Sequence, residues 1–240
     1  MKLFFSKAFI LLFSVFALVS CMGSDDEDED VTYSSWGVAY EIEEMDYDYK
    51  VLLDNGTVLI PESETSDFDV ETMDRVKVYF QLKPGFDVGL DSINVNVDYM
   101  FIFDIKDIVK QDTIEGSELL GTDPIAVYDA TVWQSNNLLN IPYAVDVSTG
   151  YDKIHSVDLV YFPDSVATED GGVYMELRHN ANNDAEDMVI DGFYSFDMES
   201  IAPFQNVSDS VPYTIIINPG AFSTAVSRLE GYYYAPSLLN

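Results

Sequence analysis

The sequence predicts an all-β protein, organised as one large β domain or two small ones. Apolar residues alternate with polar residues in short segments along nearly the whole chain, which is the period-two pattern of half-buried strands. Turn-forming residues separate these segments at intervals of about ten to twenty residues, a spacing typical of β-sandwiches. Of the 240 residues, 48% are apolar and 14% are aromatic, which is enough for a packed core.

The first half contains the clearest local signal, a β-hairpin over residues 51–60. Asn55-Gly56 lies between two apolar runs, and this pair favours a tight turn in which both residues adopt positive φ. Further strands are expected, from their alternation or their apolar content, over residues 76–82, 93–98 and 101–109. We therefore assign the first domain to residues 33–113.

A linker is expected over residues 114–123, because this segment contains two glycines and ends next to Asp123-Pro124. The second domain then occupies residues 124–240. Its six expected strands lie within residues 124–133, 138–145, 153–162, 173–177, 192–198 and 213–217. No strand is assigned to the final tyrosine-rich segment.

Residues 1–20 have the features of a secretory signal peptide. Lys2 and Lys7 precede an apolar run of about a dozen residues, which is shorter than the ~20 residues that a membrane-spanning helix needs. Cys21, the only cysteine, directly follows the small residue Ser20, and this is the arrangement of a bacterial lipoprotein. We expect the thiol of Cys21 to be acylated and to hold the protein on a membrane. An ordinary secreted protein is the alternative.

The acidic segment after Cys21 predicts a solvated tether over residues 21–32. Six consecutive acidic residues occupy positions 25–30, and such a run repels itself and cannot bury surface. Acidic runs directly after an acylated cysteine resemble the surface-export signals of Bacteroidota lipoproteins. This resemblance implies an outer-membrane lipoprotein that is exposed at the cell surface.

The charge of the chain excludes some classes of partner. The formal net charge is −32, and it becomes −34 once Lys2 and Lys7 are removed with the signal peptide. Nucleic acid is an unfavourable partner, because proteins bind a polyanion through Lys and Arg. After acylation no free thiol remains, so neither disulfides nor Cys-based metal sites are expected.

Arg178, His179 and Asn180 form the most distinctive polar cluster. They lie where an expected strand passes into a loop, so we assign them a structural role, with Arg178 paired to a carboxylate. No second His or Cys stands at metal-ligand spacing from His179, which argues against zinc. The chain contains neither a nucleophile-elbow motif nor a Gly-rich phosphate loop, so no catalytic residue and no cofactor is assigned. With 43 acidic residues, a pair of nearby carboxylates carries no information about glycosidase activity.

A weak calcium candidate overlaps this cluster. The spacing of five oxygen-bearing side chains follows positions 1, 3, 5, 7 and 12 of an EF-hand loop. The turn glycine is replaced by Ala185, and no flanking helices are expected, so an acidic hairpin loop is the favoured interpretation. The five candidates are Asn180, Asn182, Asp184, Glu186 and Asp191.

Four three-residue segments resemble the O-glycosylation motif of Bacteroidota secreted proteins. Each segment consists of an Asp, a hydroxyl-bearing residue and an Ile or Val. In an Asp-rich chain such matches also arise by chance. The candidate acceptors are Ser92, Thr113, Ser165 and Ser210.

Several motifs, in their order and spacing, resemble the NigD-like lipoprotein family. In the first half the resemblance lies in Leu53-Asp54-Asn55-Gly56-Thr57 and in the leader with its acidic tether. The more specific motifs lie in the second half. They are Gly121-Thr122-Asp123-Pro124-Ile125, Leu138-Leu139-Asn140-Ile141, residues 153–160, Glu176-Leu177-Arg178-His179-Asn180-Ala181 and residues 192–197.

The resemblance implies an N-terminal OB-like barrel domain and a C-terminal β-sandwich domain. It also implies a role in bacteriocin production or self-protection. We expect a non-catalytic surface lipoprotein that binds a protein or glycan partner. The alternatives are an accessory protein or enzyme of surface polysaccharide handling and a structural envelope component. Aromatic residues of the OB-like half could stack on a sugar, although such residues more often pack in a core. They are Trp36, Tyr40, Tyr47 and Tyr49.

Overall fold

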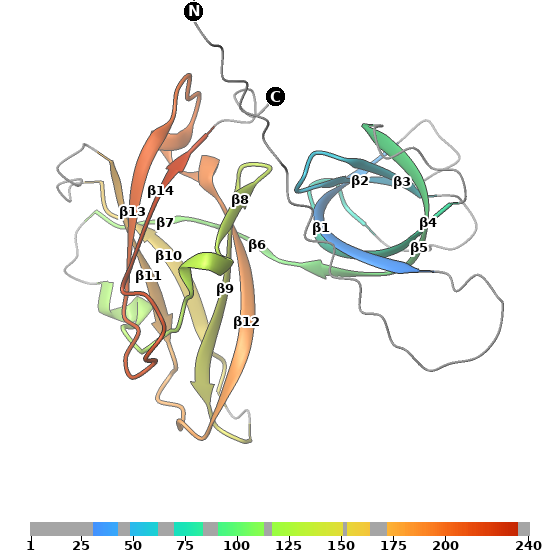
Figure 1. The fold of residues 1–240 in the computed structure, drawn as a ribbon. Coiled ribbons are helices and arrows are strands. Elements are labelled where there is room, and N and C mark those ends of the chain that lie inside the picture. Colours follow the sequence, from blue (N-terminus) through green and yellow to red (C-terminus); the bar gives the residue numbers. More distant parts are fainter. Residues whose placement is uncertain are drawn as a thin grey trace, which may run out of the picture.

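The computed structural model describes residues 31–42, 49–61, 70–83, 91–112, 117–150, 153–163 and 172–234. Within these ranges the chain forms a closed β-barrel followed by a two-sheet β-sandwich (Figure 1). The prediction of an all-β protein, with an OB-like barrel before a sandwich, is therefore confirmed.

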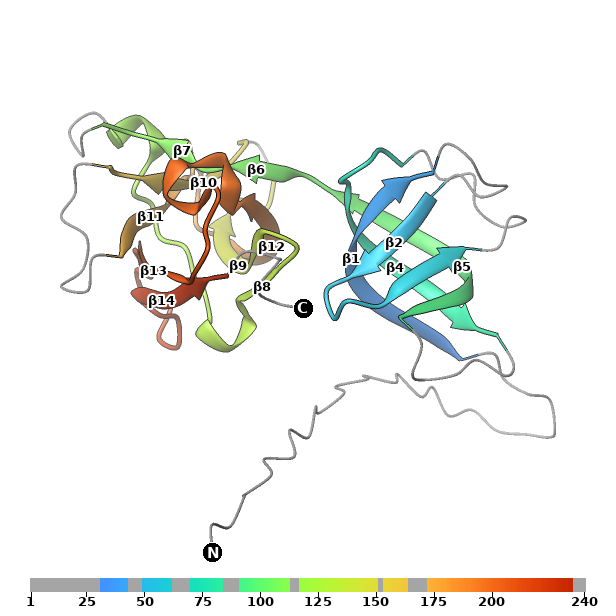
Figure 2. The same cartoon turned by 90° about the horizontal axis from the view of Figure 1, so that it is seen from above.

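Five strands form the barrel, in the order β1-β2-β3-β5-β4 around the closed sheet (Figure 2). β3 and β5 pair in parallel, and the other neighbours pair antiparallel. Alternate residues of these strands point inward, and Val51, Leu59, Val76, Val78 and Val95 are fully buried there. The strands are β1 (Thr32–Glu41), β2 (Tyr49–Leu53), β3 (Val58–Pro61), β4 (Arg75–Leu82) and β5 (Ser92–Phe103).

The expected hairpin joins β2 to β3, but its turn differs from the prediction. Leu53 accepts a hydrogen bond from the N–H of Gly56 and donates its own N–H to Thr57, so the loop has three residues. Gly56 has a φ of 87°, whereas Asn55 is not among the residues with positive φ. This is the alternative hairpin geometry in which a glycine bulge follows the turn. Asp54 therefore becomes the first residue of the turn, beside the barrel wall.

The sandwich packs a five-stranded sheet against a four-stranded sheet. The first has the order β14-β13-β11-β10-β7, from β14 (Arg228–Tyr233), β13 (Val211–Ile217), β11 (Val173–Asn180), β10 (Ser156–Tyr161) and β7 (Val109–Lys110). The second has the order β6-β12-β9-β8, from β6 (Ile105–Asp107), β12 (Met188–Asp197), β9 (Leu138–Val147) and β8 (Trp133–Ser135). Short 3-10 helices occupy Ser117–Leu120, Asp129–Thr131, Met198–Ser200 and Ala202–Phe204.

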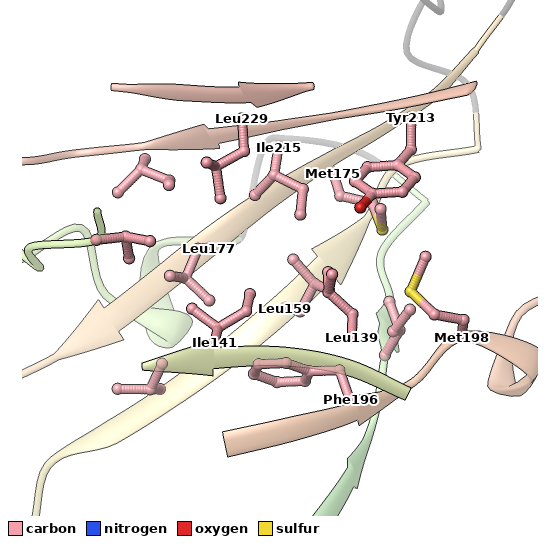
Figure 3. Close-up of a cluster of buried hydrophobic side chains, with 14 of the residues drawn as sticks. Leu139, Ile141, Leu159, Met175, Leu177, Phe196, Met198, Tyr213, Ile215 and Leu229 are labelled. Atoms are coloured by element: carbon pink, nitrogen blue, oxygen red, sulfur yellow. The ribbon is translucent and has the colours of Figure 1, made fainter. Parts of the chain in front are cut away.

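The core of the sandwich lies between the two sheets. Leu139, Ile141 and Phe196 come from the four-stranded sheet and face Leu177 and Ile215 of the other sheet (Figure 3). All five are almost completely buried. At about 25 cal/mol per Å² of apolar surface removed from water, this layer is the main stabilising contribution to the second domain.

Two glycines in the sandwich strands are covered by tyrosine rings on neighbouring strands. Gly192 pairs with Tyr143, and Gly231 pairs with Tyr213. A Cβ atom at Gly192 would lie 2.3 Å from Cζ of Tyr143, and one at Gly231 would lie 2.5 Å from the hydroxyl of Tyr213. Each ring thus fills the space that a side chain would take, which supports an otherwise weak glycine position in a strand.

The domain boundary lies earlier than the sequence suggested. The barrel ends at Phe103, and β6 and β7 within the expected first domain (33–113) belong to the sandwich, paired in parallel with β12 and β10. The described part of the expected linker (114–123) is also part of the sandwich, because Leu119 accepts a hydrogen bond from the side chain of Asn180. Glycines mark a tight turn in a domain as readily as a linker between domains, so the signal was ambiguous.

Four strand assignments differ from the prediction. The strand expected over 93–98 continues without a break to Phe103, so it includes the start of the one expected over 101–109. Residues 124–132 form an isolated bridge between Ala126 and Ala144 and a short 3-10 helix, and only Trp133 of the expected strand 124–133 begins a strand, β8. β1 was missed because Gly37, Val38 and Ala39 are all buried, which removes the alternation that marks a half-buried strand. β14 was missed because Tyr232 is exposed while Tyr233 is buried, so a run of tyrosines hides the two faces.

Candidate binding surfaces and the domain junction

A buried ion pair lies at the junction of the barrel and the sandwich. Both terminal nitrogens of the Arg75 guanidinium donate to the Asp54 carboxylate over 2.6 Å, and Arg75 also donates to the carbonyl of Gly37. The Arg75 side chain is completely buried. From the sandwich, Nε1 of Trp133 donates to Oδ2 of Asp54 over 2.7 Å, and Asn136 donates to Oδ1 over 3.5 Å. One carboxylate therefore holds groups from both domains.

Aromatic rings surround this ion pair. Phe193 of β12 stacks on Trp36 of β1 with ring centroids 4.3 Å apart, and it also stacks on Trp133 at 5.7 Å. Phe103, the last residue of the barrel, completes the cluster at 4.9 Å from Trp36. The Arg75 guanidinium lies 5.3 Å from the Trp36 ring centroid. The half-buried aromatic surroundings strengthen the charged hydrogen bonds, which join the two domains at this junction.

The outer face of the barrel carries an exposed aromatic surface beyond the junction. We call it the barrel face and define it as Lys77, Tyr79, Tyr99 and Phe101. Lys77 pairs with Phe101 and Tyr79 with Tyr99 across β4 and β5, opposite in direction to the buried Val78 and Met100. The two tyrosine rings stack at 4.4 Å, and the Phe101 ring stands at 79° to that of Tyr79. Tyr99 is 47% exposed and Phe101 is 53% exposed.

A second exposed surface lies at one edge of the sandwich. β14 is the last strand of the five-stranded sheet, and no described strand pairs with its outer side. Tyr232 points away from the core and is 56% exposed, and Tyr234 beside it is 42% exposed. Their ring centroids are 6.3 Å apart. We call these two residues the edge tyrosines.

The aromatic residues suggested by the sequence lie elsewhere. Trp36 is part of the junction, and Tyr49 is buried in the barrel core. Tyr40 is half-buried beside Lys50, and burial raises the pKa of its hydroxyl. Tyr47 lies outside the described residues. The exposed rings of Tyr79, Tyr99 and Phe101 were missed, because alternation alone does not say which rings of a strand remain uncovered.

The polar cluster of Arg178, His179 and Asn180 contacts residues 119–123, which lie between β7 and β8. Arg178 forms an ion pair with Glu176, the kind of carboxylate partner expected from the sequence, and it also donates to Gly121. Asn180 donates to Leu119. The N–H of Asp123 donates to the carbonyl of His179, and the Asp123 carboxylate accepts the N–H of Ala181. Two of the motifs that carry the family resemblance therefore pack against each other.

The two histidines of the chain also meet in this region. Nδ1 of His155 lies 2.9 Å from Nε2 of His179, and Nε2 of His155 lies 3.0 Å from Oδ2 of Asp184. Nδ1 of His179 lies 2.8 Å from the carbonyl oxygen of Pro124. The antiparallel pairing of β10 with β11 brings the rings together across 24 positions of sequence. Linear spacing could not reveal this pair, which the sequence analysis missed.

The hydrogen-bond chain determines the protons on these rings. The carbonyl of Pro124 can only accept, so Nδ1 of His179 carries a proton, and burial, the largest influence, lowers the pKa of His179 and keeps it neutral. Nε2 of His179 therefore accepts from Nδ1 of His155. Asp184 remains ionised, because a hydrogen bond from the N–H of Ser148 contributes most to lowering its pKa to about 2. His155 thus bridges His179 and the ionised Asp184.

The five calcium candidates are not arranged as an EF-hand loop. Asn180 ends β11 and Asp191 lies within β12, and these strands belong to different sheets, so the connection is an inter-sheet crossing and not a hairpin. Asp184 is engaged by Ser148 and His155. Across the described ranges, no group of three or more His, Cys, Asp or Glu side chains is placed to hold a metal ion.

The remaining site predictions are placed as follows. Ser92 is exposed at the start of β5, and Ser210 is half-buried directly before β13. Thr113, Ser165 and Cys21 lie outside the described residues. In the part of the chain that the structure describes, no helix has the length and apolar character to cross a membrane.

Comparison with known proteins gives a match for the second domain. Residues 107–216 match the family described as NigD-like C-terminal beta sandwich domain. The match begins within β6, which agrees with the boundary found in the structure. A search of curated proteins finds none that matches the chain.

Solved structures show the same two-domain fold. A toxin-related protein from Parabacteroides distasonis matches with a TM-score of 0.64 and 20% identity, over 84% of this chain and 93% of that chain. A NigD-like immunity protein from Bacteroides caccae matches with a TM-score of 0.56 and 19% identity, over 86% and 94%. A protein named as a lipoprotein from Bacteroides fragilis matches at 0.53 and 14%, over 84% and 96%. The sandwich is therefore matched by sequence to the NigD-like C-terminal domain, and the solved structures share the fold of both domains.

Proposed function

We propose that this protein is a lipid-anchored binding protein of the bacterial envelope, without catalytic activity, and that it serves self-protection against a bacteriocin. Two similar structures support the proposal by their names, one as a NigD-like immunity protein and one as a lipoprotein. In this proposal Cys21 carries the lipid, the acidic segment spans from the lipid to the barrel, and the domains lie at the cell surface.

The observation that carries the binding role is the pair of edge tyrosines. Tyr232 stands exposed on β14, and Tyr234 stands exposed directly after it; the outer edge of β14 is unpaired among the described strands. Tyrosine is enriched where proteins recognise one another, because it offers a large ring and a hydroxyl at a small cost in conformational entropy. An unpaired strand edge adds backbone groups that an extended segment of a partner can use.

Glycan binding is the second candidate, because exposed tyrosine rings also stack on sugars. In that case the protein is an accessory to surface polysaccharide handling. The edge tyrosines are the binding surface in both cases, so the same double variant of Tyr232 and Tyr234 tests both candidates. A glycan array with the purified protein separates the two candidates, since only the second predicts retention of a specific sugar.

The test is complementation of a deletion strain. The double variant Tyr232→Ser/Tyr234→Ser should fail to restore resistance to the cognate bacteriocin, whereas Val189→Ser, an equally exposed change on the other sheet, should restore it. Unchanged bacteriocin sensitivity after deletion would contradict the role in self-protection. Full restoration by the double variant would contradict the edge tyrosines as the binding surface.

A further inference from the structure

The barrel face lies between the sandwich and the start of β1. On β1, Trp36 at the junction pairs with Lys77, and Ser34 pairs with Tyr79. Thr32, the first residue of the strand, pairs with Gln81, and both side chains donate to the Asp98 carboxylate. The chain therefore enters the barrel two positions along the strand from Tyr79, at the end of the face that is remote from the sandwich.

The length of chain before β1 limits how far the barrel can move from the lipid. Ten residues separate Cys21 from Thr32. Fully extended, this span reaches at most about 40 Å, which is comparable to the size of one small domain. If Cys21 is acylated as proposed above, the end of the barrel that bears Thr32 is held close to the bilayer.

β4 and β5, which carry the barrel face, and their neighbour β1 are poor in acidic residues. β1, β4 and β5 contain Glu41 and Asp98 as their acidic residues and Arg75 and Lys77 as their basic residues. Their net charge is thus zero in a chain whose net charge is −32. An anionic bilayer repels the molecule as a whole, and these strands add no net charge to that repulsion.

The residue types of the barrel face match those of a membrane interface. Tyrosine and phenylalanine rings partition into the headgroup region, and lysine pairs with lipid phosphate while its methylenes stay on the apolar side. Nζ of Lys77 lies 5.6 Å from the Tyr79 ring centroid, so the charge is held directly beside the rings. From position, charge and composition together, we infer that the barrel face rests on the lipid bilayer.

This inference rests on the proposed lipid anchor, and it assigns the barrel face a different partner from the edge tyrosines. The bilayer contacts Tyr99 and Phe101, and the soluble partner contacts Tyr232 and Tyr234. The two surfaces lie on different domains, so the two assignments are compatible. A soluble protein or glycan on the barrel face is the competing outcome.

The test uses the full, lipidated chain in vesicles of phosphatidylethanolamine and phosphatidylglycerol. Because acylation blocks Cys21, a nitroxide attaches only to an introduced thiol. Labels are placed by Phe101→Cys on the barrel face, Lys50→Cys on the outer side of β2 and Tyr232→Cys on the sandwich. These positions are all exposed, so folding is not at risk. Relaxation by oxygen and by a water-soluble nickel chelate then reports the depth of each label.

We expect the label at position 101 to gain accessibility to oxygen and to lose accessibility to nickel several-fold relative to positions 50 and 232. Adding Lys77→Glu should return the label at position 101 to water. If the protein floats with the vesicles but all three labels are equally accessible to nickel, the barrel-face assignment alone is overturned. Protein that fails to float with the vesicles would overturn the anchor and this inference together.

Discussion

Asp54 and Trp133 are joined by a hydrogen bond of 2.7 Å, although one belongs to a barrel turn and the other to a sandwich edge strand. Asp54 also neutralises the buried Arg75, so the contact between the domains and the charge balance of the barrel depend on one carboxylate. A buried pair that loses one partner leaves an uncompensated charge, and this makes Asp54 the most sensitive residue of the junction.

Replacing Asp54 by alanine should lower the free energy of unfolding by about 3–5 kcal/mol, because the Arg75 guanidinium stays buried without its counter-ion. Denaturant unfolding measures the change. Asp112→Ala is the matched control, since Asp112 forms only an exposed pair with Lys110, and the expected change is within about 0.5 kcal/mol. Equal stability of the two variants would mean that the junction does not depend on this ion pair.

Gly121→Ala should destabilise the sandwich far more than Gly56→Ala destabilises the barrel. Both glycines have positive φ, 79° and 87°, so both substitutions carry a conformational cost of about 1–2 kcal/mol. A Cβ at position 121 would also lie 2.2 Å from the carbonyl oxygen of His179, whereas a Cβ at position 56 meets nothing within 4 Å. Thermal unfolding of the two variants separates the effects, and equal losses would show that the backbone around His179 yields.

Within the histidine pair, His179 should be neutral at neutral pH, because burial lowers its pKa. Proton–nitrogen correlation spectra should report the tautomer of His179 that carries its proton on Nδ1, which donates to the Pro124 carbonyl. The His155→Gln variant should remove the His155 signals and shift those of His179, which assigns the two sets. Detection of His179 with its proton on Nε2 would contradict the proton order derived from the Pro124 carbonyl.

Stability should fall as the solution is acidified, in two steps. The pKa of His179 is lowered in the folded protein, so below the ordinary value of 6.5 the unfolded chain binds a proton that the folded chain does not. The pKa of Asp184 is lowered to about 2, so its contribution is present above 3.8 and is lost as the pH falls from 3.8 towards 2. Burial raises the pKa of Asp197, which acts in the opposite direction at pH values just above 3.8.

Urea titrations at a series of pH values measure these steps. His179→Gln should flatten the first step and leave the second, and Asp184→Asn should do the reverse. A first step that persists in His179→Gln would assign it to another group. His155 contacts both His179 and Asp184, so some coupling between the His179→Gln and Asp184→Asn variants is expected.

The sequence located a strand correctly wherever one face of the strand is buried and the other is exposed to solvent. The alternation of Val76, Val78 and Phe80 located β4, and Asn55-Gly56 located the hairpin, because both are local signals. β1 was missed because the junction covers its second face. The topology of the barrel came from the family resemblance, since period-two patterns do not specify which strands become neighbours.

The candidate sites were less predictable, because each one depends on long-range pairing. Asp54 and Trp133 are 79 positions apart, and His155 and His179 meet only because β10 and β11 are adjacent. Exposed rings such as Phe101 cannot be told from buried ones by residue type. By contrast, the structural role expected for Arg178 could be argued from sequence, because a guanidinium in an acidic domain finds a carboxylate nearby.

Only Asp104 separates the last barrel strand from the first sandwich strand. A gene fragment cut at the apparent linker, after residue 113, would encode a sandwich without β6 and β7 and would leave their hydrogen-bonding neighbours β12 and β10 open to aggregation. An exchange of halves between related genes that keeps both domains intact must therefore break the coding sequence near codon 104.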